Sequence, residues 1–237
     1  MSRKLLEIKS VSLSFGGLRA LDEASLFVEE GRVFALIGPN GAGKTTLFNV
    51  IAGALAADSG QIIFVEKDIT SLKPYEICRA GISRTFQLKN LFPNLTVFDN
   101  VMAGVLKNAL DDSTRRKKVF EILEFLGINN VVDSVVSNIT PLESKLVELG
   151  RALATSPKLI LLDELIGGLL PSETDKICDI VEELRGRGYT ILQVGHEIKP
   201  IMKTSDWVFV LDQGRNVADG PPEDIRCNAD VLACYLE

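Results

Sequence analysis

The chain has 237 residues, of which 46% are hydrophobic and 24% charged, values typical of a globular protein that buries a sizeable core. Its formal net charge of -6 argues against a dedicated nucleic-acid binder, which would show a basic excess. No apolar run is long enough to cross a bilayer, and the four cysteines include neither a C-x-x-C pair nor metal-site spacing, so we expect reduced, packed thiols.

A strand is expected over residues 6–15, where apolar residues recur around polar ones, and a second one over residues 25–28. Residues 15–21, Phe-Gly-Gly-Leu-Arg-Ala-Leu, lie between them. This stretch resembles the segment that places an aromatic ring against adenine in ATP-binding-cassette (ABC) ATPases. Phe15 is therefore a candidate for stacking on a purine, and a simple core aromatic is the alternative.

Residues 38–46 match the phosphate-loop pattern G-x-x-x-x-G-K-[ST] at every fixed position. They follow an apolar run at 33–37, typical of a buried parallel strand, and lead into a helix expected over 44–52. An ordinary glycine turn would not require this context. Lys44 is expected to contact the terminal phosphates of a nucleotide, and Thr45 to offer its hydroxyl to Mg²⁺. The candidate ATP-binding residues of the loop are Gly38, Pro39, Asn40, Gly41, Ala42, Gly43, Lys44, Thr45 and Thr46.

A strand over residues 61–65 and a short helix over 74–80 are expected next. Residues 84–87 then read Arg-Thr-Phe-Gln, and 91–97 read Leu-Phe-Pro-Asn-Leu-Thr-Val. Together they resemble the Q-loop region of the branched-chain amino acid transporter ATPases. In that family the glutamine contacts Mg²⁺ or the attacking water and links the nucleotide site to the membrane subunits. The resemblance makes Gln87 the candidate coupling residue and a candidate metal ligand; taken alone, it would be a surface glutamine.

An amphipathic helix is expected around residues 119–126, with Asp112 or Ser113 as its N-cap. The basic run at 115–118, at the start of this helix, is interpreted as a solvated face. A partner surface or lipid headgroups remain alternatives, because cations in a first helical turn oppose the helix dipole.

A second apolar strand, at residues 159–162, ends in Asp163 and Glu164 and resembles a Walker B motif. Asp163 is expected to hold Mg²⁺ directly or through water. Glu164 should point elsewhere, because side chains alternate along a strand, and it is the candidate general base. Two solvent-facing acids at a strand end are the alternative.

Beyond a helix that Ser172 is expected to cap and a strand at residues 190–194, the chain reaches its only histidine, His196. This residue resembles the switch histidine of ABC ATPases, which contacts the γ-phosphate; a structural histidine is the alternative. A terminal hairpin is expected at 207–218 and a helical tail at 230–236.

One motif departs from the family pattern. Residues 139–143 read Ile-Thr-Pro-Leu-Glu where ABC ATPases usually carry Leu-Ser-Gly-Gly-Gln, and Pro141 has no N–H to offer a phosphate. Leu165 and Leu170 also stand where proline and aspartate are common in the family. Each ATP in the family is held between one subunit's phosphate loop and the other subunit's signature motif. We therefore expect this chain's own site to be competent and the opposite site to be weakened, in a heterodimer with a related ATPase or, alternatively, in a homodimer.

The expected fold is an α/β P-loop domain with a parallel core sheet, an antiparallel N-terminal β portion and an inserted helical subdomain. We expect the nucleotide-binding core at 1–87 and 156–237 and the helical subdomain at 88–155. The resemblance implies an ATP- and Mg²⁺-dependent ATPase that drives an importer of branched-chain or related amino acids. Its partners would be permease subunits, which hold it at the cytoplasmic face of the membrane, and indirectly an extracytoplasmic solute-binding protein. The alternatives are an ABC ATPase of another process, such as lipid export, and a regulatory clamp that grips ATP with weak hydrolysis.

Overall fold

The computed structural model describes residues 3–85, 91–106 and 110–235. A four-stranded antiparallel sheet with the order β2-β1-β4-β5 forms one part of the molecule, as expected of its N-terminal portion. Its strands are β1 (Lys4–Phe15), β2 (Leu18–Glu29), β4 (Ser59–Phe64) and β5 (Lys67–Asp68). The strand β2 is longer than the predicted 25–28, because a tight turn at Gly16 and Gly17 lets Leu18 pair at once with Phe15.

The second sheet has six strands in the order β10-β9-β3-β8-β7-β6. Its strands are β3 (Val33–Ile37), β6 (Ile82–Arg84), β7 (Leu159–Asp163), β8 (Thr190–Val194), β9 (Trp207–Asp212) and β10 (Arg215–Gly220). All but β10 run parallel to their neighbours. Every residue of β3, β7 and β8 is buried, which explains why their sequences are mainly apolar.

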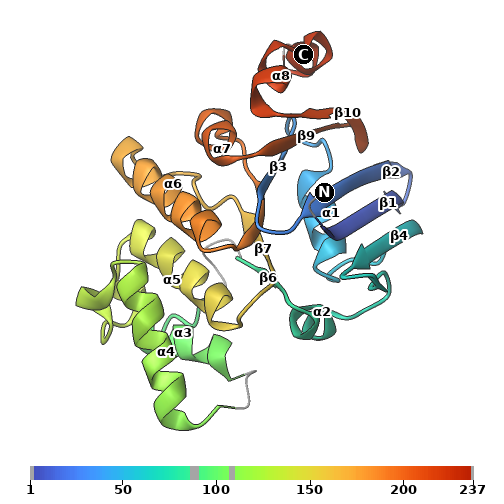
Figure 1. Cartoon of the computed structure of the whole chain (residues 1–237). Coiled ribbons are helices and arrows are strands. Elements are labelled where there is room, and N and C mark those ends of the chain that lie inside the picture. The colour runs from blue at the N-terminus through green and yellow to red at the C-terminus, as the bar shows by residue number, and fades with distance from the viewer. Residues whose placement is uncertain (1–2, 86–90, 107–109, 236–237) are drawn as a thin grey trace.

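Helices cover both faces of this core sheet (Figure 1). The helices are α1 (Lys44–Ile51), α2 (Pro74–Ala80), α3 (Val97–Val105), α4 (Asp112–Phe125), α5 (Pro141–Ala154), α6 (Pro171–Gly186), α7 (Ile198–Thr204), α8 (Pro222–Cys227) and α9 (Ala229–Cys234). Short 3₁₀ turns lie at Asn129–Val131 and Val136–Asn138. No helix in the described ranges is both long and apolar enough to span a bilayer.

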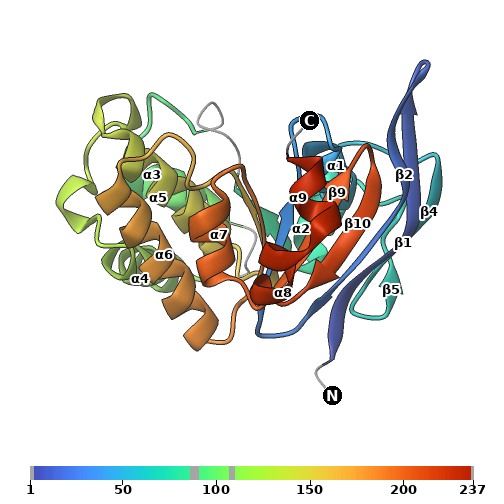
Figure 2. The same cartoon turned by 90° about the horizontal axis from the view of Figure 1, so that it is seen from above.

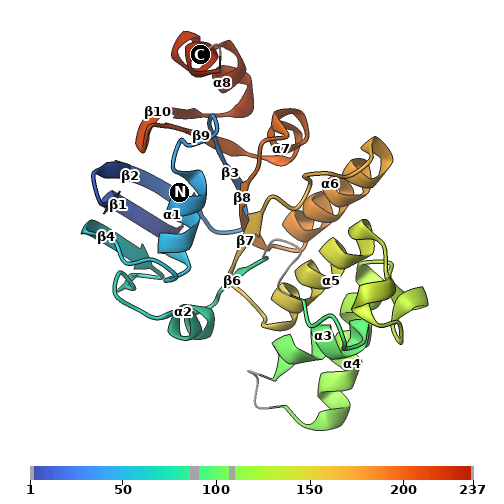
Figure 3. The ribbon, with the colours of Figure 1, turned by 180° about the vertical axis from the view of Figure 1, so that it is seen from behind.

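Alternation along the core strands divides the hydrophobic interior in two. Phe34 and Leu36 of β3 face α1 and the antiparallel sheet, so that α1 is packed between the two sheets. Val33, Ala35 and Ile37 face the other way, toward a core that includes residues of α3, α4, α5 and α6. Figures 2 and 3 show the resulting arrangement, with α3, α4 and α5 gathered on the side away from β1, β2 and β4. The core sheet therefore lies between two differently built halves of the molecule.

Two predicted helix caps and one predicted thiol environment are wrong. The cap of α4 is Asp111, whose carboxylate accepts the backbone N–H of Thr114 at 3.0 Å. The helix α6 begins at Pro171, whose fixed φ suits a first helical position, so Ser172 lies inside the first turn. The four cysteines, all within the described residues, form no disulfide, but Cys227 is exposed rather than packed, because it ends the short helix α8 at the surface.

Candidate active site

The loop between β3 and α1 is wound tightly enough to need glycine at fixed points. Gly38, Gly41 and Gly43 have φ values of 152°, 83° and 97°, a region that L side chains rarely adopt. A Cβ atom on Gly43 would lie 2.5 Å from the carbonyl oxygen of Ala20. The loop therefore needs glycine both for its own turns and for its close approach to β2.

Lys44 opens α1 and lies across the start of its own loop. Its Nζ donates hydrogen bonds of 2.7 Å to the carbonyl oxygens of both Gly38 and Pro39. Burial lowers the pKa of this ammonium, and the negative charge of Glu164 acts in the opposite direction. The structure thus brings the loop lysine and the predicted general base together, from positions far apart in the sequence.

A cleft of about 340 Å³ lies over the loop. It is lined by Phe15, Leu18, Arg19, Ala20, residues 40–46 and Glu164. Phe15 is 48% exposed at the end of β1, so the alternative of a core aromatic does not fit. The aromatic ring, the loop residues including Thr45, and the carboxylate of Glu164 consequently border one space.

Asp163 ends β7 beside a buried arginine. Arg84, the last residue of the neighbouring strand β6, donates to Oδ2 of Asp163 at 2.5 Å, and the two side chains are 8% and 6% exposed. Arg84 also donates to Oδ1 of Asn49 on α1 at 2.7 Å. Arg84 was not among the site residues predicted from the sequence, where it stands only within the stretch that resembles the Q-loop region. The available signal was its charge on a short buried strand, which requires an ionic partner.

Glu164 follows Asp163 but no longer belongs to the strand. Its φ of 48° is left-handed, its N–H donates to the carbonyl oxygen of Val194 at 2.9 Å, and its own carbonyl accepts the N–H of Gly167 at 3.2 Å. The expectation that strand alternation aims Glu164 is therefore wrong, because β7 ends at Asp163. The left-handed turn, held at both ends by hydrogen bonds, sets the direction of the carboxylate.

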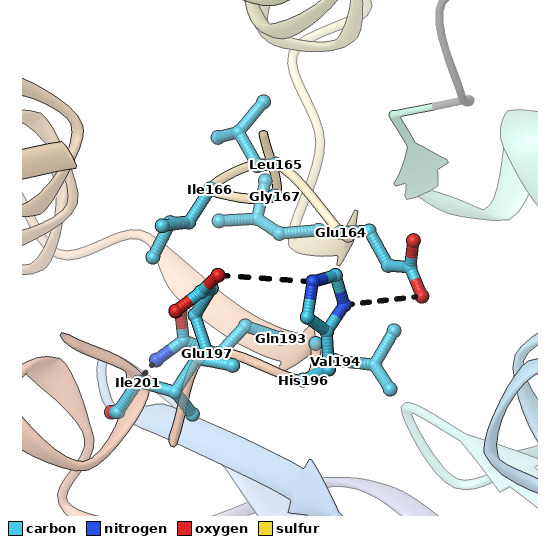
Figure 4. A pocket seen from close by; sticks show the side chains of 11 residues that line it. Glu164, Leu165, Ile166, Gly167, Gln193, Val194, His196, Glu197 and Ile201 are labelled. Carbon is cyan, nitrogen blue, oxygen red and sulfur yellow. Dashed lines mark hydrogen bonds and ion pairs between the residues drawn. The ribbon is translucent and has the colours of Figure 1, made fainter. Parts of the chain in front are cut away.

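His196 lies just beyond β8 and faces Glu164. Its Nδ1 is 3.8 Å from Oε1 of Glu164, and its Nε2 is 3.8 Å from Oε1 of Glu197. Figure 4 shows the imidazole between the two carboxylates. The histidine and the acid thus stand next to each other, whereas Gln87 lies outside the described residues.

The degenerate motif at residues 139–143 forms the start of α5. Thr140 caps the helix, accepting the N–H of Glu143 through its hydroxyl at 3.2 Å. In return, Oε2 of Glu143 accepts the N–H and O–H of Thr140 at 2.8 and 2.9 Å. This reciprocal capping box places a carboxylate on the helix N-terminus, where an anion would otherwise bind.

A buried parallel strand, a glycine loop and a helix, with two acids at the end of a neighbouring strand, define the class of the protein: it is a P-loop nucleotide-binding ATPase. The sequence model of the ABC transporter family matches residues 21–167. The chain belongs to this family, as one of its ATP-binding subunits.

Two relatives and one solved structure match this chain along almost its whole length. The probable branched-chain amino acid transport ATP-binding protein LivG of Archaeoglobus fulgidus is 35% identical over 245 residues, covering 98% of this chain and 95% of the relative. The high-affinity LivG of Salmonella typhimurium is 35% identical over 252 residues, covering 100% and 99%. An ATP-binding cassette of an ABC transporter, solved in its ADP conformation, superimposes with a TM-score of 0.90 at 33% identity over 99% of each chain.

Proposed function

We propose that this ATPase drives an importer of branched-chain or related amino acids. The observation that carries the proposal is the single cleft in which Phe15, the phosphate loop and Glu164 meet, in a chain whose full-length relatives bear the names of branched-chain amino acid transporters. Adenine stacks on Phe15, and the phosphates lie along residues 38–46, with Lys44 neutralising the terminal charge.

The residues at the loop fit Mg²⁺. Thr45 and Asp163 offer the oxygen ligands that a hard cation prefers, and Gln87 is proposed as a third ligand. The described ranges contain no cluster of three or more His, Cys, Asp or Glu side chains of the kind that would hold a metal without other ligands. This suits an ion that is completed by phosphate and water. Mg²⁺ supplies charge stabilisation for phosphoryl transfer when bound.

Glu164 and His196 act on the attacking water and on the γ-phosphate that is transferred to it. The Glu164 carboxylate accepts a hydrogen bond from water, orients it toward the γ-phosphorus, and takes its proton as the new P–O bond forms. The bond between the γ-phosphorus and the β,γ-bridging oxygen breaks at the same time, and ADP leaves. His196, 3.8 Å from this carboxylate, contacts the γ-phosphate and keeps the acid in place. Backbone N–H groups of the loop and Lys44 carry the charge that develops on the phosphate oxygens.

The start of α5 supports a dimer with unequal sites. In such a dimer this end would meet the partner's nucleotide, but the carboxylate of Glu143 already accepts the available donors of Thr140. Leu170, exposed at the start of α6, offers no charge there either. We therefore propose a heterodimer with a related ATPase. The test replaces the catalytic Glu by Gln in each subunit separately. The replacement in this chain should abolish turnover, whereas the replacement in the partner should not, and equal losses would contradict the asymmetry.

A groove of about 300 Å³ supports docking to a permease. It lies between α2, β6, α3 and α5 and is lined largely by apolar atoms, including Pro74, Ile77 and Phe92. We propose residues 88–155 as the inserted helical subdomain and the groove beside it as the surface that a permease contacts. Such docking would hold the chain at the cytoplasmic face of the membrane, with a solute-binding protein acting on the other side.

Reconstitution tests this proposal. The chain is purified with its membrane partners into vesicles, and ATP-dependent leucine uptake is compared with that of the Lys44→Ala complex. Uptake that requires both ATP and Lys44 is expected. Lipid movement without amino acid uptake would indicate an exporter, and ATP binding without phosphate release would indicate a regulatory clamp.

A further inference from the structure

Lys145 is an unusual residue for the interior of α5. It is 8% exposed, lies one turn before the buried Glu148, and is followed by the buried apolar residues Leu146 and Val147. Lysine is almost never this buried unless its charge has a partner. The placement of its ammonium therefore needs an explanation.

That ammonium reaches the residue proposed as the general base. Nζ of Lys145 donates a hydrogen bond of 3.0 Å to the backbone carbonyl oxygen of Glu164. Burial lowers the pKa of Lys145, and the negative charges of Glu148 and Glu164 oppose this shift. The bond joins α5 to the segment that directly follows β7.

The Glu164 backbone depends on bonds of this kind. Its φ of 48° is unfavourable for a residue with a side chain and persists only where the surroundings impose it. The N–H is held by Val194, and the carbonyl is held by Gly167 and by Lys145. Among these three partners, Lys145 is the one that binds the Glu164 backbone through a charged side chain, and a charge-assisted hydrogen bond is stronger than a neutral one.

We propose that Lys145 is a positioning residue for Glu164: its ammonium fixes the Glu164 carbonyl and thereby holds the carboxylate beside His196 and the nucleotide cleft. The inference rests on the proposed function, because it assigns Lys145 to the same site. It also links that site to α5, since Lys145 lies only about 1.4 turns, at 3.6 residues per turn, beyond the capping residue Thr140. A shift of α5 on partner binding would reach the general base through this bond.

Kinetics of the purified complex test the proposal through Lys145→Met and Lys145→Arg. Lys145→Met should lower kcat for ATP hydrolysis about tenfold or more, because small misplacements of a reacting group are costly, while KM for ATP stays within about twofold. Lys145→Arg keeps a cationic donor and should recover most of kcat. Lys118→Met is the matched control: it removes a lysine from α4 that contacts Ser156, and kcat should stay unchanged.

Three outcomes would overturn the proposal: wild-type kcat in Lys145→Met, a change in KM alone, or equal losses of kcat in Lys145→Met and Lys145→Arg. If Lys145→Met does not fold, Lys145→Gln replaces it, with the same expected loss of kcat relative to Lys145→Arg.

Hydrogen exchange of the nucleotide-free chain separates this inference from the proposed function. Faster exchange of the Gly167 amide, which donates to the Glu164 carbonyl, is expected in Lys145→Met and not in Lys118→Met. If the wild-type complex does not hydrolyse ATP, the proposed function fails, but this readout still reports on Lys145. An unchanged Gly167 amide would overturn the positioning role.

Discussion

The ion pair between Arg84 and Asp163 allows a quantitative test of how the site is built. The two side chains are 2.5 Å apart and less than a tenth exposed, and Arg84 also contacts Asn49. In the absence of metal, Arg84 is the cation that compensates the Asp163 carboxylate. Arg84→Met would leave that carboxylate buried without its cation.

Breaking a buried pair by removing one partner costs about 3–5 kcal/mol. For a chain of this length, Tm falls by about 2–4 °C per kcal/mol, so Arg84→Met should lower Tm by roughly 10 °C. The double variant Arg84→Met/Asp163→Asn removes both charges and should be more stable than Arg84→Met alone. The expected coupling free energy is about 2–3 kcal/mol, at the upper end for residues in direct contact.

Urea unfolding of the wild-type chain, Arg84→Met, Asp163→Asn and the double variant, in EDTA and without nucleotide, measures this coupling. Lys117→Met serves as the control, because its pair with Glu121 is 3.9 Å long and exposed, and should change stability by less than about 0.5 kcal/mol. Additivity of the Arg84 and Asp163 substitutions within about 0.5 kcal/mol would refute the reasoning.

Three further predictions concern the cleft, the loop and a buried acid. Phe15→Ala should weaken nucleotide binding about tenfold, since stacking a base on an aromatic ring contributes about 1–3 kcal/mol; calorimetric titration with ADP measures it. Gly43→Ala should destabilise the fold by about 2 kcal/mol in urea unfolding, because the new Cβ would meet the Ala20 carbonyl at a φ of 97°. Burial raises the pKa of Glu148 to about 7, and the positive charges of Arg151 and Lys145 oppose this shift. The stability that the protonated form contributes is therefore complete below the unfolded pKa near 4.5 and is lost as pH rises through about 7. The Tm of the wild-type protein relative to Glu148→Gln should therefore fall by a few degrees between about pH 5 and about pH 8, and a constant difference would contradict this.

Local patterns in the sequence predicted the elements that carry the site. The strands β3 and β7 contain continuous apolar runs at residues 33–37 and 159–162, and β8 is mainly apolar, so their position and buried character could be predicted. The phosphate loop was identified from its spacing for the same reason. These features depend on residues close together in the chain.

Contacts between distant residues were not predictable. Arg84 meets Asp163 across 79 positions, and Lys145 reaches Glu164 from another element. No periodicity indicates either pair. The predicted direction of Glu164 was wrong because the strand ends at Asp163, one position before the second acid, and Glu164 itself is left-handed. The role of Gln87 stays a prediction.

Phosphate release by the purified complex, with Glu164→Gln compared with the wild-type chain, tests the central claim most directly. General-base removal typically costs about 10²- to 10⁴-fold, so the variant should bind Mg²⁺ and ATP with unchanged affinity and release phosphate at least about 100-fold more slowly. Wild-type release by Glu164→Gln, with nucleotide affinity unchanged, would contradict the assignment of Glu164 and of the cleft that it shares with Lys44.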